Sequence, residues 1–119
     1  MQLTADHAIF FKNIAILNDA MRTTGMAAYY CPSHGVDQLT IDQFYALYSA
    51  VRSYNDFTLD DDPLGCHGQG KIELFGKAFI WRFEYEYPDN ELLEFCDPRI
   101  VRKIAVMLME ELPAGSKHR

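Results

Sequence analysis

The first apolar residues of the chain recur at the spacing of a helix. Thr4 or Asp6 can cap the first free N–H groups, and Gly25 can end the element. Between them the apolar positions are separated by four, three and four residues, at Phe10, Ile14, Leu17 and Met21. This pattern predicts an amphipathic helix with one buried stripe.

A short strand and a second helix are indicated next. The tyrosine-rich segment from Ala27 to Pro32 precedes a turn-prone Ser33-His34-Gly35, which favours a brief strand. Thr40 and Gln43 have the spacing of a capping box, in which hydroxyl and amide side chains satisfy free N–H groups at the start of a helix. That helix carries apolar residues at helical spacing: Ile41, Phe44, Leu47, Tyr48 and Val51.

A long loop and a hairpin follow. Acids, a proline and glycines leave residues 55–70 without a periodic apolar face, so we expect a loop there. Two strand-like runs, Lys71 to Phe75 and Ala78 to Tyr87, flank Gly76-Lys77. The second run alternates between a largely polar face and an aromatic one, which consists of Phe79, Trp81, Phe83, Tyr85 and Tyr87. An alternating aromatic face usually packs against helices, although Trp81, Tyr85 and Tyr87 could anchor an interface if left uncovered.

The last apolar run also has helical spacing. Asp97 as cap and Pro98 as first helical residue predict a third helix, with apolar positions at Val101, Ile104, Leu108 and Leu112. The expected order is helix, strand, helix, strand, strand, helix. We therefore predict an α+β fold in which three helices pack on a small antiparallel sheet of about three strands. Residues 1–119 form one domain in this prediction, and 113–119 are a disordered tail.

Composition is consistent with one packed domain in a reducing compartment. The 119 residues are 49% hydrophobic and 24% charged, too apolar for intrinsic disorder. Neither a membrane-length apolar run nor a signal peptide is evident, so a cytoplasmic protein is expected. Cys31, Cys66 and Cys96 are an odd number of cysteines, which favours free thiols.

The net charge of −6 is concentrated in the middle of the chain. Residues 54–97 contain eleven acids and three bases, a net charge of −8, whereas 1–53 carry −1 and 98–119 carry +3. Such a balance opposes direct binding to nucleic acid, because affinity for phosphates comes largely from Lys and Arg. The negative charge favours a basic partner, such as the nucleic-acid groove of another protein. The alternative is that the acidic surface only keeps the protein soluble. The candidate contact residues are Asp56, Asp60, Asp61, Asp62, Glu84, Glu86, Asp89, Glu91 and Glu94.

Other candidate chemistry has weaker spacing. The pairs Cys31 with His34 and Cys66 with His67 are suitable zinc ligands, or a thiol with an imidazole base, only if the fold unites them. Asp60-Asp61-Asp62 could hold a divalent cation but lacks the ligand pattern of a calcium loop. Glu84 and Glu86 lie about 7 Å apart on one side of the predicted strand, where they could act as an acid and a base or simply be solvated. We therefore assign no catalytic residue, metal or cofactor.

Several segments together resemble one protein family, the domain of unknown function 3768 family. The resemblance covers most of the chain and is carried by the order and spacing of Leu17–Gly25, Val51-Arg52, Asp56-Phe57-Thr58, Asp61-Asp62-Pro63, Gly65, His67, Trp81, Asp97-Pro98 and Ile104–Glu111. It implies a proteobacterial protein carried by plasmids, prophages or other mobile elements, with no assigned reaction.

Two motifs depart from the family pattern. Where the family reads Glu-His-Asp-Phe-Gly, this chain has Cys66-His67-Gly68-Gln69-Gly70. Where it reads Lys-Ile-Asp-Tyr, this chain has Arg82-Phe83-Glu84-Tyr85. A catalytic or metal-binding use of the first motif would be lost here, whereas a structural hydrogen-bond cluster could tolerate the change.

The acidic charge and the resemblance lead to one leading hypothesis and two alternatives. The leading hypothesis is a non-enzymatic, anti-CRISPR-type protein whose acidic surface binds and inhibits a host nucleic-acid-processing defence complex, such as a CRISPR effector. The first alternative is an enzyme or metal-binding protein using the loop around Cys66 and His67. The second is a regulator or homodimeric accessory protein of a mobile element.

Overall fold

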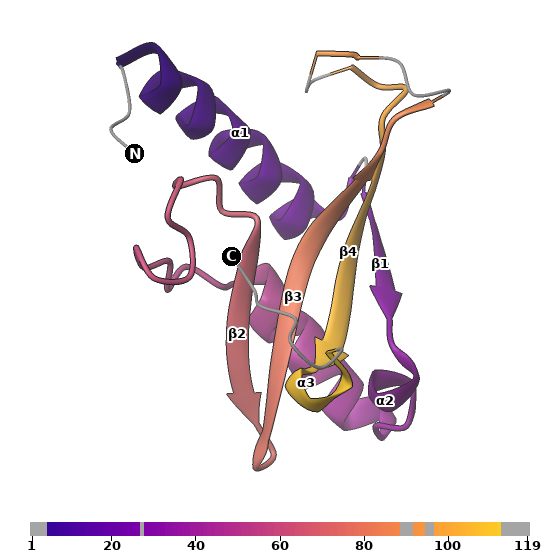
Figure 1. The fold of residues 1–119 in the computed structure, drawn as a ribbon. Coiled ribbons are helices and arrows are strands. Elements are labelled where there is room, and N and C mark those ends of the chain that lie inside the picture. Colours follow the sequence, from indigo (N-terminus) through magenta and orange to yellow (C-terminus); the bar gives the residue numbers. More distant parts are fainter. Residues whose placement is uncertain (1–4, 27, 89–91, 95–96, 113–119) are drawn as a thin grey trace.

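The helices of this protein cover one face of a four-stranded sheet (Figure 1). The computed structural model describes residues 5–26, 28–88, 92–94 and 97–112, and the side chains from residue 8 onward. Three helices precede most of the sheet: α1 (Ala5–Thr24), α2 (His34–Asp37) and α3 (Ile41–Arg52). The strands are β1 (Tyr29–Pro32), β2 (Gln69–Leu74), β3 (Lys77–Glu86) and β4 (Val101–Leu108), and a 3₁₀ turn, η2 (Met109–Glu111), follows. The predicted α+β class is confirmed.

The predicted third helix is wrong, because Val101 to Leu108 form the strand β4. In β4 the residues at positions 102, 104, 106 and 108 are buried, and so is Ala105 from the opposite face. Because apolar residues occupy both faces of β4, its sequence lacks the polar–apolar alternation of a half-buried strand, and periodicity cannot distinguish it from a helix. The Asp97 carboxylate does not cap a helix but accepts hydrogen bonds from the backbone and side chain of Arg99, in a turn that leads into β4.

The sheet has four strands in the order β1-β4-β3-β2, rather than about three. Both β2 and β4 pair antiparallel with β3, so the predicted hairpin is confirmed. β1 pairs parallel with β4, with Tyr29 opposite Lys103 and Cys31 opposite Ala105. The sheet is therefore mixed and not purely antiparallel. Its last strand in sequence lies at its centre, between β1 and β3.

The aromatic face of β3 forms the core, as expected for an alternating strand covered by helices. Phe79, Trp81 and Phe83 are buried, with Trp81 fully inaccessible, and pack with Leu47 and Val51 of α3. Farther along the strand Tyr85 is half-buried, and burial raises the pKa of its phenol to about 12. Tyr87 is 39% exposed, so the tyrosine that could serve as an interface anchor lies where β3 leaves the core.

The end of α1 and the start of α3 are formed by the residues that the sequence indicates. Gly25 adopts a positive φ of 74° and donates its N–H to the carbonyl of Met21, which ends α1. At α3 the capping box between Thr40 and Gln43 is present in full. The buried stripe of α1 is only partly as predicted, because Phe10 is 54% exposed while Met21 is buried. Asp6 lies within the helix, and the other proposed cap, Thr4, is outside the described residues, as is the predicted tail 113–119.

Gly70 is required where the hairpin packs on the aromatic core. A Cβ at this position would lie 2.5 Å from Cζ of Tyr54 and 2.7 Å from Nε1 of Trp81. The rings of Trp81 and Tyr54 meet in a T-shaped arrangement, at a centroid distance of 5.4 Å. We expect Gly70→Ala to lower the free energy of unfolding by about 1–3 kcal/mol, the usual cost of overpacking.

Gly68→Ala is the matched control for this substitution, measured in the same urea titration. The nearest atom to a Cβ at Gly68 is 4.0 Å away, so this variant should change stability little. Equal losses in the two variants would contradict steric crowding at Gly70.

A carboxylate clasp joins the turn after β1 to the turn after β4. The carboxylate of Glu111 accepts hydrogen bonds from the Ser33 hydroxyl at 2.5 Å, the Leu108 N–H at 2.8 Å and the Gly35 N–H at 2.9 Å. Partial burial raises the pKa of Glu111, but the three hydrogen-bond donors lower it further, so the pKa lies below its ordinary value of 4.5.

The clasp predicts a loss of stability in acid. A carboxyl whose pKa is lowered on folding stabilises the native state above its unfolded pKa, and this contribution disappears as the pH falls through the folded value. We expect the free energy of unfolding to decrease as the pH falls below 4.5, more steeply in the wild type than in Glu111→Gln. Identical pH profiles from urea denaturation of the two proteins would contradict the clasp.

Candidate functional site

The C-terminal half of α1 places three polar residues against the rest of the fold. Asn18 is fully buried, Arg22 is 2% exposed, and Asp19 lies beside them at the edge of the helix. Asn18 and Arg22 are four residues apart and so share one face of α1. Polar groups at such depth require partners, and theirs come from α3, from β3 and from the loop before β2.

Arg22 caps the end of α3. Its Nη1 group donates to the carbonyl of Val51 at 2.7 Å and to that of Arg52 at 3.1 Å. These carbonyls are in the last turn of α3, where intrahelical donors are lacking and the helix dipole is negative. The guanidinium also lies over the rings of Trp81 and Phe57, at 5.0 and 5.6 Å from their centroids. One side chain thus joins α1, α3, the sheet and the loop.

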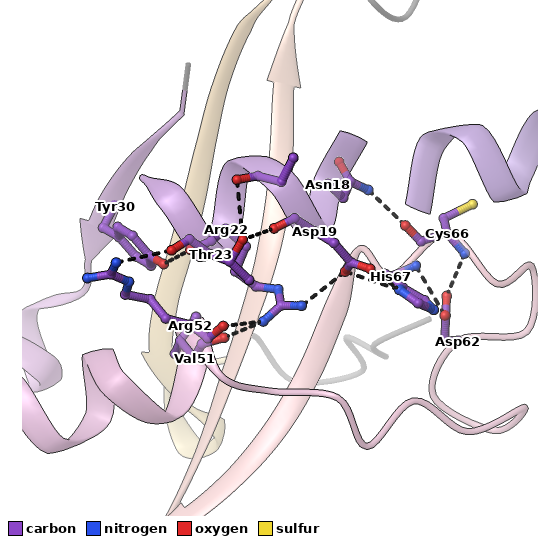
Figure 2. Close-up of polar contacts among 11 residues, drawn as sticks. Asn18, Asp19, Arg22, Thr23, Tyr30, Val51, Arg52, Asp62, Cys66 and His67 are labelled. Carbon is purple, nitrogen blue, oxygen red and sulfur yellow. Dashed lines mark hydrogen bonds and ion pairs between the residues drawn. The ribbon is translucent and has the colours of Figure 1, made fainter. Parts of the chain in front are cut away.

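Asp19 connects this guanidinium to the loop. Its Oδ1 accepts from Nη2 of Arg22 at 3.0 Å, and its carboxylate lies 2.9 and 3.1 Å from Nδ1 of His67 (Figure 2). A proton on Nδ1 satisfies this contact and makes Nε2 the acceptor nitrogen of the imidazole. The His67 ring is stacked on Phe57 at a centroid distance of 3.9 Å and an interplanar angle of 1°. The orientation of the imidazole is therefore fixed by a carboxylate and by an aromatic ring.

The backbone around His67 is held from two further sides. The carboxylate of Asp62 accepts from the N–H groups of Cys66 at 3.0 Å and His67 at 3.1 Å. The Asn18 amide donates to the carbonyl of Cys66 at 2.9 Å and accepts from the Tyr85 hydroxyl at 3.0 Å. These contacts support the positive φ of 54° at His67, which a non-glycine residue rarely adopts. We call Asn18, Asp19, Arg22, Asp62 and His67 the latch.

An open hollow of about 470 Å³ lies beside the latch, between the ends of α1 and α3. Asp19, Arg52 and His67 are among its lining residues, and Arg52 donates to the carbonyl of Thr23 at 3.0 Å. An imidazole oriented by a carboxylate is an arrangement that can accept a proton from a bound molecule. The neighbouring thiol is poorly suited to catalysis, because burial and the Asp62 charge raise the pKa of Cys66 to about 11.

Seven of the nine predicted contact acids lie in the described part of the chain, and these seven are divided among different surroundings. Asp56 and Asp60 are exposed in the loop after α3, whereas Asp61 lies 3.6 Å from Nζ of Lys71 and Asp62 is 8% exposed within the latch. Phe83 and Tyr85 point toward the helices. Because side chains alternate along a strand, Glu84 and Glu86 project from the other face of β3.

The remaining acids differ in their surroundings. Glu84 is 3.8 Å from Arg82 and Glu86 is 2.9 Å from Lys103, so basic neighbours offset part of the charge on this face. Glu94 is exposed, and Asp89 and Glu91 lie outside the described residues. Asp56 and Asp60 are therefore exposed acids that share one loop, the one after α3.

The two cysteine–histidine pairs do not form a metal site in the described part of the chain. Cys31 is exposed on β1, His34 begins α2, and Cys66 with His67 is in the loop before β2. Among the described side chains no group of three or more His, Cys, Asp or Glu residues could hold a metal ion. Asp62 of the proposed cation loop is instead hydrogen-bonded to backbone N–H groups. Cys96 is outside the described residues.

Sequence reasoning on candidate chemistry missed Asn18, Asp19 and Arg22. They entered only through the family resemblance, in the segment Leu17–Gly25. A usable signal was present in the sequence. Asn18 directly follows Leu17 and Arg22 directly follows Met21, so two polar residues one turn apart lie next to the apolar stripe. Polar residues inside an apolar stripe indicate a buried network.

Comparison with known proteins identifies a family. A family model described as protein of unknown function (DUF3768) matches residues 33–111. This segment includes Phe57, Asp62 and His67, whereas Asn18, Asp19 and Arg22 precede it. No curated protein and no solved structure matches the chain significantly. None of the described helices has the length and apolar character needed to cross a membrane.

The burial of Arg22 predicts that its loss is costly. Arg22→Met would remove the donor to the Arg52 carbonyl and the shorter of two hydrogen bonds to the Val51 carbonyl, and it would leave Asp19 without its nearest positive charge. We therefore expect the free energy of unfolding to decrease by about 2–4 kcal/mol. The measurement is urea denaturation followed by circular dichroism.

Arg52→Met provides the matched control, since Arg52 lines the same hollow but is exposed. Its single hydrogen bond to Thr23 should contribute less than about 1 kcal/mol. A comparable loss in both variants would show that Arg22 does not have the central role assigned to it.

Proposed function

This chain belongs to the DUF3768 family, and we propose that it is a non-enzymatic acidic protein that binds a basic surface of a partner and thereby inhibits it. The partner class we propose is a host nucleic-acid-processing defence complex, such as a CRISPR effector, in the cytoplasm of a bacterium. An acidic inhibitor can occupy a groove that evolved to hold phosphates, because both present negative charge to Lys and Arg side chains.

The observation that supports this proposal is the way the loop after α3 is held. Asn18 and Asp19 fix its second half to α1, and Asp62 binds the N–H groups of Cys66 and His67 within the loop, so these polar groups serve its conformation. Its first half presents Asp56 and Asp60 to solvent, with Leu59 between them at 82% exposure. A loop held in one conformation loses less entropy on binding, which favours its use as a contact surface.

The chemistry of this loop defines the partner surface. Leu59 would enter an apolar depression, and Asp56 and Asp60 would meet Lys or Arg side chains at its rim. Binding should weaken as salt is raised, because these charges are exposed and therefore screened. The acids on the outer face of β3 contribute less in this proposal, since Lys103 and Arg82 lie next to Glu86 and Glu84.

Charge reversal in the loop tests the proposal. A pull-down from the host cell with mass spectrometry identifies the partner, and its affinity for the purified protein is then measured by calorimetry. We expect Asp56→Lys combined with Asp60→Lys to weaken binding at least tenfold, which corresponds to about 1.4 kcal/mol. Inhibition of the partner should fall in parallel.

A double variant with the same change in net charge serves as the control. Asp37→Lys with Asp42→Lys alters exposed acids in α2 and in the first turn of α3, at the opposite end of α3 from the loop. This control should retain most of the affinity and all of the inhibition. Equal weakening by the two double variants would mean that only net charge matters, and no weakening by either would refute the electrostatic proposal.

An enzyme acting through His67 is the second candidate, because the imidazole is oriented by Asp19 at the edge of the hollow. His67→Asn and Cys66→Ala distinguish it from a binder in the same inhibition assay, together with a metal assay on the purified protein. A catalyst should lose its effect on the partner in His67→Asn even when binding is retained. A binder should inhibit in proportion to the fraction of partner bound, in the variants as in the wild type.

A further inference from the structure

The first half of α1 is apolar on nearly all sides and yet exposed. Residues 8–17 read AIFFKNIAIL, in which Lys12 and Asn13 are the polar positions. Ile9 and Ile16 are each 59% exposed, and Phe10 is 54% exposed. A helix that is hydrophobic all round is normally buried, and contiguous exposed apolar surface marks an interaction site.

This half of the helix extends beyond the sheet, whereas the other half is attached to it. The buried residues of α1 that hold it to the fold are Ala15, Asn18, Met21 and Arg22. Figure 1 shows the N-terminal turns of α1 projecting away from the strands. The apolar residues of these turns therefore have little of the described part of the chain to pack against.

An outward stripe runs along the whole helix, opposite the buried face. Ile9, Asn13, Ile16 and Ala20 are separated by four, three and four residues, which places them in a narrow line on a helix of 3.6 residues per turn. All four are exposed. Leu64, at 41% exposure, adjoins this line and borders a groove of about 450 Å³ with Ala15 and Ile16.

We propose that this surface binds a second copy of the chain, with the two α1 helices packed antiparallel about a two-fold axis. Lys12 and Asp19 lie on one flank of the stripe, seven residues apart. In an antiparallel pair the same flanks of both helices meet, so Lys12 of each chain approaches Asp19 of the other. The flank is thus complementary to itself in charge, as the isologous interface of a two-fold dimer requires.

The same residues argue against a lipid surface as the occupant. Helices that lie on membranes carry several Lys or Arg residues on their polar face and are attracted to anionic lipids. Residues 8–21 of α1 contain one base, Lys12, in a protein of net charge −6.

The mass of the protein in solution tests the proposal. Sedimentation equilibrium of the full chain at tens of micromolar should give twice the 13.7 kDa of one chain. Ile9→Glu combined with Ile16→Glu should raise the dimer dissociation constant at least about a hundredfold, because four buried isoleucines per dimer become charged. Lys12→Glu should raise it by a smaller factor, since it reverses the charge of two exposed pairs.

The control introduces the same charges elsewhere on the surface. Leu59→Glu with Leu92→Glu alters residues that are 82% and 100% exposed, and this variant should remain dimeric. Circular dichroism confirms that each variant is folded. A monomeric wild type, or a dimer that persists in the Ile9→Glu, Ile16→Glu variant, would overturn the proposal.

Co-sedimentation with phosphatidylglycerol vesicles completes the experiment. A monomeric wild type that binds these vesicles through Ile9 and Ile16 would assign the surface to lipid and overturn the dimer. Either result leaves the inhibitor proposal intact, because the contact acids Asp56 and Asp60 are in the loop after α3 and outside this surface.

Discussion

The burial of one guanidinium beneath the aromatic core is the interaction on which the rest of this fold depends. Arg22 of α1 donates a hydrogen bond to a carbonyl in the last turn of α3, and its guanidinium lies over the ring of Trp81 in β3. A buried charge is tolerated only where hydrogen bonds and an opposite charge surround it, and here they come from α3 and Asp19. The position of α1 is therefore fixed by this charge together with the apolar contacts of Met21 and Leu17.

The latch passes this constraint to the loop before β2. Asp19 interacts with both Arg22 and His67, and the His67 ring rests on Phe57, which itself lies under the guanidinium. A glycine- and acid-rich segment that lacks regular structure thus acquires a defined conformation from its contacts with a helix. The family model begins after α1, so the segment it matches is completed here by three side chains from outside it.

Local patterns predicted α1, α3 and the hairpin, because caps, turns and periodic apolar positions act within a few residues. The pattern failed at β4, where apolar residues on both faces removed the alternation that identifies a strand. It also gave no indication that β1 pairs parallel with β4, since Tyr29 and Lys103 meet only after the intervening chain has folded. The latch was beyond reach for the same reason, because His67 and Asp19 are 48 residues apart. Counting charges located the acidic segment but could not separate Asp62, which is used internally, from Asp56, which is exposed.

The central position of β4 affects how this protein can be made. Chain synthesis proceeds from α1 onward, yet the strand that joins β1 to β3 is translated after every other strand. Until β4 leaves the ribosome, β1 has no neighbour, and the edge of β3 that β4 will occupy stays open to pairing with other chains. The nascent chain is therefore vulnerable to such pairing between the emergence of β3 and that of β4, and completion of the sheet waits until this strand inserts.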